Sequence, residues 1–456
     1  MRTLLPILLV AGALSACEGG SSDSTGSGSM PPANPDGLSA AAGLGKKIFA
    51  DTALSASGTQ SCGSCHVAAF AFTADRTAAG PDHGSVVPLG GATMDLPGFR
   101  DTPSLAYLSY SPDFFFDNEG GPNGGFFRDG RAGTLADQAI APFTTHFEMA
   151  NTDAAAVIAK LRARPYFADF IALYGAAVLD DADTALKRVG AAIAAYETEA
   201  SEFHPFTSKY DAFQDGQAEL SAQELRGLAL FNDPSKGNCA GCHPSTSADG
   251  GTPPLFTDFS YDNLGVPRNP HILANDPGTA PDYTPANGID GLHFYYDLGI
   301  CGPFRDDGGL NTSALCGAFK VPTLRNVAVT GPYFHNGRFA TLKDAIGFYV
   351  RRDTNPEEFY PTTADGTVTK FDDLPAAYGG QFVVNIHVPG SDANYLGNVN
   401  TGEIPYNRHI GDLPALNADE INDVIAFLCT LTDGFDARNP GAQVLPAQCQ
   451  AAAVSR

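Results

Sequence analysis

Two pentapeptides, Cys62-Gly-Ser-Cys65-His66 and Cys239-Ala-Gly-Cys242-His243, follow the pattern Cys-x-x-Cys-His. This spacing is the attachment signature of c-type haem, in which both thiols bind the haem covalently and the adjacent His ligates the iron. A redox-active cysteine pair or half of a zinc site would use the same cysteines but would give the following histidines no function. The sequence therefore predicts two covalently bound haem c groups, with His66 and His243 as iron ligands.

The residues before the two motifs repeat each other. Leu38-Ser39-Ala40 precedes Gly-Lys-Lys-Ile-Phe at 45–49, and Leu220-Ser221-Ala222 precedes Gly-Leu-Ala-Leu-Phe at 227–231. Each stretch has a serine N-cap followed by apolar residues at helical spacing. Such an internal repeat predicts a mainly α fold built from two cytochrome c-like haem domains.

We place these domains at residues 38–205 and 206–456. Further helices are expected at 183–199 and at 417–431, where the second begins with a capping-box signal. Strand signals are sparse, and 381–388 is the best candidate. The 50 glycines and 33 prolines predict long loops.

The N-terminus predicts export. Residues 1–16 combine one arginine, a short apolar run and small residues, too short to span a bilayer as a stable helix. Leu14-Ser15-Ala16-Cys17 resembles a bacterial lipobox, so we expect 1–17 to be a lipoprotein-type signal peptide and the protein to face the periplasm, lipid-anchored to the outer membrane. An ordinary signal peptide is the alternative. Residues 18–37, rich in Gly, Ser, Pro and Asn, predict a flexible tether.

The remaining cysteines fit an oxidising compartment. Besides Cys17 and the motif cysteines, the chain has Cys301, Cys316, Cys429 and Cys449. An even number in an exported protein predicts two disulfides. Three pairings are possible, and proximity along the chain favours Cys301–Cys316 and Cys429–Cys449.

The net charge of −24 argues against binding to nucleic acid or to anionic membrane surfaces. It would help to attract a basic soluble redox partner, although an ordinary acidic exterior would give the same charge.

The second iron cannot take a methionine ligand from its own domain. All four methionines precede the second motif: Met1, Met30, Met94 and Met149. An electron carrier usually has Met or a second His as the sixth ligand. The groups available after the second motif are several tyrosines and His271, His293, His335, His387 and His409.

Six ordered motifs resemble the bacterial di-haem cytochrome c peroxidase and MauG superfamily. They are Arg100-Asp101-Thr102-Pro103-Ser104, Asp129-Gly130-Arg131-Ala132, Asp137-Gln138-Ala139 with Pro142, Glu148-Met149, Phe-Lys-Val-Pro-Thr-Leu-Arg-Asn at 319–326 and Gly-Pro-Tyr-Phe-His-Asn-Gly-Arg at 331–338. The resemblance extends from about residue 38 to residue 350 and resumes at the final helix. It implies a peroxidatic first haem and an electron-transfer second haem.

For the first haem, the resemblance implies that Gln138 and Glu148 are the catalytic residues. A carboxylate whose pKa is raised by burial can take a proton from bound peroxide and return it to the leaving oxygen. Gln138 can hydrogen-bond the peroxide, and Pro142 would shape the pocket.

For the second haem, the family's ligand position lies fourteen residues after His335 and is Tyr349. Ordinary peroxidases of the family have Met there, whereas MauG-type enzymes have Tyr. A buried core tyrosine on a helix at 342–350 is the alternative, and His335 would then be the next ligand candidate.

Two further sites follow from the resemblance. His83 is a candidate ligand that would block the first iron at rest, as in many family peroxidases, although MauG-type enzymes lack it; Met94 is a third possibility. A calcium ion between the domains would be held by Asp101 and by the carbonyls of Thr330 and Pro332.

One position departs from the family pattern. The inter-haem Trp that precedes Asp-Gly-Arg is Arg128 here, and the chain contains no Trp. Electron exchange between the haems must then use another route, which puts MauG-like sharing of oxidising equivalents in doubt.

Together these features predict a periplasmic di-haem peroxidase that reduces hydrogen peroxide to water with electrons from a small redox protein such as cytochrome c or a cupredoxin. The alternatives are a MauG-like enzyme that oxidises a protein or a small organic substrate, and a di-haem electron carrier. Family members are often dimers, so a homodimer is a further expectation.

Overall fold

The structure is a computed structural model that describes residues 36–75, 87–248, 250–272, 296–302, 304–305 and 313–454. The predicted signal peptide, most of the predicted tether, His83 and His293 lie outside the described residues.

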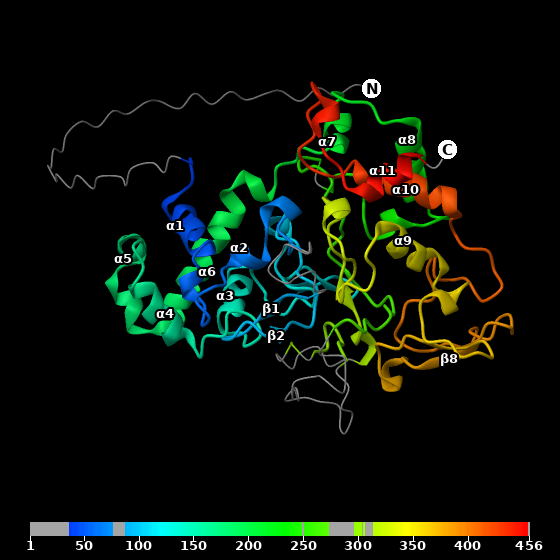
Figure 1. Cartoon of the computed structure of the whole chain (residues 1–456), viewed down its shortest axis with the longest axis horizontal. Helices are drawn as coiled ribbons and strands as arrows, with labels where there is room; N and C mark the ends of the chain where they lie inside the picture. The colour runs from blue at the N-terminus through cyan, green and yellow to red at the C-terminus, as the bar shows by residue number, and fades with distance from the viewer. Residues whose placement is uncertain are drawn as a thin grey trace, which may run out of the picture.

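The described chain is mainly helical, as predicted, and its strands are short (Figure 1). Its α-helices are α1 (Ala40–Phe49), α2 (Cys62–Cys65), α3 (Leu135–Thr144), α4 (Ala154–Arg162), α5 (Phe167–Tyr174), α6 (Ala182–Glu199), α7 (Lys209–Gln214), α8 (Ala222–Asn232), α9 (Leu342–Arg351), α10 (Ala418–Cys429) and α11 (Ala447–Val454). The strands form antiparallel pairs: β1 (Leu89–Gly90) with β2 (Leu96–Pro97), β3 (Phe115–Phe116) with β4 (Pro122–Asn123), β5 (Tyr261–Asp262) with β6 (Phe319–Lys320), and β7 (Thr367–Lys370) with β8 (Phe382–Asn385).

The two repeated helices begin where the serine caps predicted them. The Ser39 hydroxyl accepts a hydrogen bond from the backbone N–H of Ala42 (3.1 Å), and the Ser221 hydroxyl accepts one from that of Glu224 (3.2 Å). The predicted helices at 183–199 and 417–431 correspond to α6 and α10, and the predicted strand contains β8. These elements carry their signals locally, in caps and periodicity.

A glycine lets each repeated helix cross a second helix closely. Helix α1 packs against α6, where a side chain at Gly45 would overlap the carbonyl of Ala192. Helix α8 packs against α10, where a side chain at Gly227 would overlap the carbonyl of Asp423. The repeat thus includes the same close helix crossing in both halves.

Two large hydrophobic cores organise the molecule. One contains buried residues between 42 and 203 and lies among α1 and α3 to α6; the other contains buried residues between 210 and 449 and lies among α7 to α11. Figure 1 shows these two helix groups on opposite sides of the view. The exact division at 205/206 stays a prediction.

Polar contacts join the two helix groups. The Tyr107 hydroxyl donates to the Asp433 carboxylate (2.8 Å), and the Arg325 guanidinium lies 4.9 Å from the centre of the Tyr107 ring. The backbone N–H of Asp101 donates to the carbonyl of His335 (2.8 Å). Residues far apart in the sequence therefore fix the relative position of the two haem motifs.

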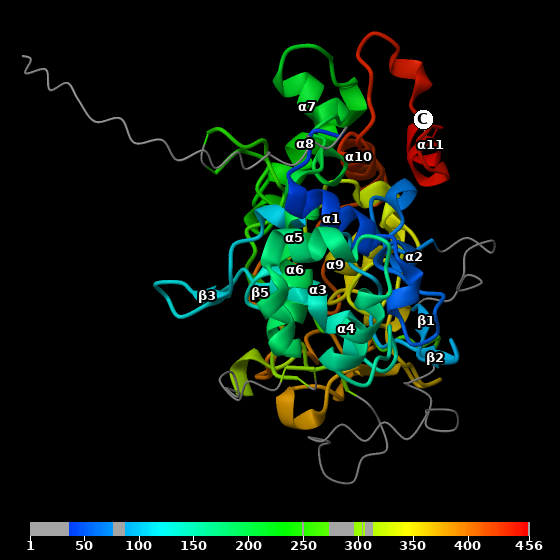
Figure 2. The ribbon, with the colours of Figure 1, turned by 90° about the vertical axis from the view of Figure 1, so that its left-hand side faces the viewer.

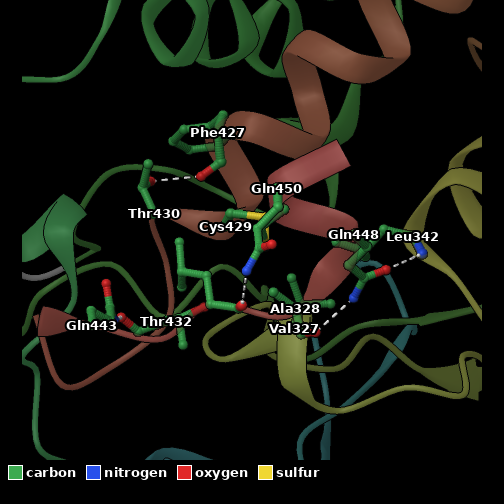
Figure 3. The surroundings of a disulfide bond; sticks show 12 residues. Val327, Ala328, Leu342, Phe427, Cys429, Thr430, Thr432, Gln443, Gln448 and Gln450 are labelled. Carbon is green, nitrogen blue, oxygen red and sulfur yellow. Dashed lines mark hydrogen bonds between the residues drawn. A yellow bond between two sulfur atoms is a disulfide. The ribbon is translucent and has the colours of Figure 1, made fainter. Parts of the chain in front are cut away.

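Both disulfides favoured by sequence proximity are present, Cys301–Cys316 and Cys429–Cys449. The second connects α10 with α11. Beside it, the Gln448 side chain accepts from the backbone N–H of Leu342 (2.9 Å) and donates to the carbonyl of Ala328 (2.6 Å), as Figure 3 shows. The start of α11 is thereby held against the start of α9.

None of the helices within the described ranges is long and apolar enough to cross a membrane.

Two candidate haem centres

The first Cys-x-x-Cys-His motif forms α2 and the residue after it. The Nδ1 atom of His66 hydrogen-bonds the carbonyl oxygen of Phe72 (2.9 Å). Because a carbonyl only accepts, this bond places the proton on Nδ1 and makes Nε2 the iron-binding nitrogen. Cys62 and Cys65 stay outside both disulfides. Two thiols available to bind the haem covalently and an imidazole Nε2 available to bind its iron therefore fit a covalently attached haem.

The second motif has the same arrangement. Its cysteines lie in and directly after the short 3₁₀ helix Cys239–Gly241. The Nδ1 atom of His243 hydrogen-bonds the carbonyl of Phe256 (2.8 Å). Burial lowers the pKa of His243, which favours the neutral imidazole that a metal requires.

Sequence reasoning missed the two phenylalanines that orient these histidines. Both Phe72 and Phe256 have left-handed backbone conformations, with φ of 60° and 53°. Such a conformation is strained for a bulky residue, and it persists where the surrounding structure requires it. Here each turn directs a carbonyl at an imidazole Nδ1. No local sequence signal identifies this role.

A cavity of about 320 Å³ is bordered by the second motif. Cys239, Cys242 and His243 line it, together with Tyr349 of α9 and Tyr406. Its size and largely apolar lining fit the bulk of a haem ring. The structure thus brings Tyr349 to the same cavity as the second haem motif.

The two tyrosines of this cavity are neighbours. Their ring centres lie 6.1 Å apart, and the guanidinium of Arg352 lies 4.4 Å from the centre of the Tyr406 ring. Burial raises the pKa of Tyr349, as do the nearby Cys242 and Asp262, while Arg352 opposes the increase. A bound ferric iron would be the charge that favours the phenolate here.

His335, the alternative ligand candidate, lines the same cavity. Its ring stacks on that of Phe319, with centres 3.8 Å apart, and its Nε2 lies 3.9 Å from a carboxylate oxygen of Asp373. The other described histidines after the second motif are exposed and do not line the cavity: His271, His387 and His409.

A smaller cavity, of about 70 Å³, adjoins the first motif. Cys62, Cys65 and His66 line it together with the predicted catalytic residues Gln138 and Glu148 and the predicted pocket residue Pro142. Burial raises the pKa of the Glu148 carboxyl against the opposing effects of Arg131 and a hydrogen bond from Thr145. The structure therefore places a proton-accepting group and an amide beside the first haem site. The role of each stays a prediction.

Glu197 is a second carboxyl in this cavity that sequence reasoning missed. It lies on α6, is 3% exposed, and its Oε2 has no hydrogen-bond partner. Burial raises its pKa to about 8. The sequence did contain a signal for its burial. Glu197 follows Ile193 by four residues, and this helical spacing places both on the buried face of α6.

The two cavities share Leu105 and Gln138 in their linings, so the haem sites are adjacent. Met94 lies between β1 and β2 and lines neither cavity.

The predicted calcium ligand Asp101 has a protein partner. The Arg128 guanidinium donates to the Asp101 carboxylate (3.1 Å), and its Nε donates to the Asp101 carbonyl (3.1 Å). Asp101, Thr330 and Pro332 line the larger cavity. The residue that replaces the expected Trp thus pairs with the predicted calcium ligand and would compete with a calcium ion for its carboxylate. The calcium site stays a prediction.

Comparison with known proteins agrees with this geometry. Residues 39–219 match the family model described as di-haem cytochrome c peroxidase. The chain is 40% identical to the methylamine utilization protein MauG of Paracoccus denitrificans over 311 residues, which cover 68% of this chain and 74% of that protein. It is 28% identical to the cytochrome c551 peroxidase of Nitrosomonas europaea over 316 residues, which cover 69% and 74% of the two chains. The crystal structure of the diheme peroxidase BthA of Burkholderia thailandensis is similar with a TM-score of 0.71 and 36% identity, covering 89% of this chain and 88% of that one. The chain belongs to the di-haem cytochrome c peroxidase and MauG family.

Proposed function

We propose that this protein reduces hydrogen peroxide to water at its first haem centre, with electrons from a small soluble redox protein. Each turnover takes one peroxide, two protons and two electrons and gives two water molecules. The observation that carries the proposal is the joint lining of one cavity by His66, Gln138 and Glu148.

The haem would supply peroxide binding and electron transfer. The protein's own residues would manage the protons. Glu148 accepts a proton from one peroxide oxygen and donates it to the other as the O–O bond breaks, and its burial suits both steps. The Gln138 amide donates a hydrogen bond that orients the peroxide.

A MauG-like oxidation of a protein or a small organic substrate is the second candidate. It is favoured by Tyr349, which lines the same cavity as His243, and by the 40% identity to MauG of Paracoccus denitrificans. A phenolate ligand would lower the potential of the second haem relative to methionine. Arg128 stands in place of the inter-haem Trp, which puts MauG-like sharing of oxidising equivalents between the haems in doubt. This replacement favours the peroxidase that only reduces hydrogen peroxide.

We further propose a periplasmic location with an N-terminal lipid anchor at Cys17. The two disulfides support an oxidising compartment.

The test is to add near-stoichiometric hydrogen peroxide to the purified di-ferric protein and to follow both irons by absorbance and electron paramagnetic resonance. An immediate spectral change would support an open first iron and the MauG-like candidate. A response only after one haem is reduced, followed by rapid turnover with reduced cytochrome c, would support a peroxidase with a blocked resting state. No response in either state would refute peroxidase function and leave an electron carrier.

A further inference from the structure

A hairpin formed by β3 and β4 exposes two adjacent aromatic rings. Phe115 is 44% exposed and Phe116 is 49% exposed, and Figure 2 shows the hairpin extending away from the body of the protein. The other large exposed apolar side chains of the described residues are aliphatic. Two neighbouring exposed Phe side chains are unusual on a surface that needs only to be soluble, and aromatic rings are enriched at interfaces.

The hairpin is ordered by its own contacts. The Asp117 carboxylate accepts hydrogen bonds from the backbone N–H groups of Glu119 (2.9 Å) and Gly121 (2.8 Å) across the turn. At the base, the Phe114 ring packs against Tyr261 (6.2 Å between centres) and under the guanidinium of Arg305 (4.4 Å). The exposed rings are therefore presented on a fixed support, which reduces the entropy lost on binding.

The base of the hairpin connects to the second haem motif. The backbone N–H of Gly124 donates to the carbonyl of Phe259 (3.0 Å), and the Asn123 side chain donates to the carbonyl of Asp258 (3.1 Å). The backbone N–H of Asp258 in turn donates to the carbonyl of Cys242 (3.0 Å). A partner bound at the tip would thus be linked through a short chain of hydrogen bonds to the residue that attaches the second haem.

The charges around the tip indicate the kind of partner. The stretch 112–124 contains the exposed acidic residues Asp113, Asp117 and Glu119 and has no Lys, Arg or His. The whole chain has a net charge of −24. An apolar centre with an acidic rim complements a protein that has an apolar contact patch surrounded by lysines or arginines. The small area suits a transient redox encounter, in which interfaces bury less than about 1,200 Å².

We propose that the tip of the β3–β4 hairpin is the docking surface for a small basic redox protein that delivers electrons to the second haem. Each reduced partner gives up one electron, so two partners dock in turn for every peroxide reduced. The inference rests on the proposed peroxidase function.

The experiment compares two surface variants of the holoprotein. Phe115→Ser/Phe116→Ser removes both rings, and Leu396→Ser/Leu413→Ser removes two side chains that are 97% and 83% exposed elsewhere. Peroxide-dependent turnover is measured with a reduced basic cytochrome c and separately with a small-molecule dye as electron donor. We expect kcat/KM for the cytochrome to fall by about tenfold or more in the phenylalanine variant. This factor corresponds to about 1.4 kcal/mol, and aromatic contacts at the centre of an interface often contribute at least that much. Turnover with the dye and both rates of the leucine variant should stay unchanged.

The proposed function and the docking surface are tested by different outcomes. Absence of turnover with both donors in the wild type would overturn the proposed function. Turnover with the dye but not with the basic cytochrome, or equal kcat/KM in wild type and phenylalanine variant, would overturn the docking surface alone. A charge variant, Glu119→Lys, should also weaken the dependence of the cytochrome rate on salt concentration. An unchanged dependence would contradict the proposal that acidic residues around the tip attract the basic partner.

Discussion

Replacement of Glu197 by Gln should stabilise the protein at alkaline pH. The wild-type carboxyl is buried beside the first haem motif with an unpartnered oxygen, and burial raises its pKa from 4.5 to about 8. A carboxyl that must lose its proton in such a place destabilises the folded state, because the unfolded chain ionises it in water at much lower cost.

The size and sign of the effect follow from the two pKa values. Below pH 4.5 the group is protonated in both states and has no effect. Between pH 4.5 and about 8 the unfolded state loses the proton first, so the free energy of unfolding falls by about 1.4 kcal/mol per pH unit. Above pH 8 the loss is complete and amounts to about 5 kcal/mol. Glu197→Gln cannot ionise and should lack this dependence.

The measurement is guanidinium unfolding of the holoprotein at intervals from pH 5 to pH 9, followed by circular dichroism. The stability of Glu197→Gln relative to wild type should rise with pH by several kcal/mol. Glu219→Gln, which changes an exposed carboxyl, is the matched control and should show no such trend. A difference that is constant with pH, or a variant that is less stable than wild type at pH 8, would show that the carboxyl gains a compensating partner once the haem is in place.

Three further changes test the remaining site residues. Glu148→Gln keeps the shape of the side chain but cannot accept a proton, so the peroxide reaction measured by stopped flow should slow by about 10²–10⁴-fold; a change below threefold would exclude its role as the base. Tyr349→Met should raise the potential of the second haem by on the order of 0.1 V in a spectroelectrochemical titration, and an unchanged potential would argue that Tyr349 is only a core residue. Arg128→Gln removes the guanidinium paired with Asp101 and should cost about 3 kcal/mol of stability. Added calcium chloride should restore part of that stability in the variant and leave the wild type unchanged; calcium-dependent melting of the wild type would contradict the reasoning.

The sequence was sufficient where the signal is local. The haem motifs, the helices that begin after Ser39 and Ser221, and both disulfides could be predicted from short spacings and caps. Each depends on residues within about twenty positions of one another, so chain geometry alone restricts the outcome.

The sequence was insufficient where distant segments meet. The carbonyls of Phe72 and Phe256 reach their histidines only because of unusual backbone angles, which no composition signal marks. Arg128 was recognised as a departure from the family, but its contact with Asp101 depends on how two loops approach each other. Such contacts are set by tertiary packing and not by propensity.

Equivalent helices of the two halves carry different side chains at the cavities of the two haem motifs. Helix α3 is capped by Thr134 and α9 by Thr341, and in both the capping hydroxyl accepts from the backbone N–H of an aspartate three residues on. Eight residues after the cap, α3 has Pro142 and α9 has Tyr349, and each lines the cavity of its own haem motif. A proline has no group that can bind a metal, whereas a phenol can. Equivalent positions of one structural unit would therefore offer a ligand to the second iron and none to the first, which is the division of work that the proposed peroxidase function requires.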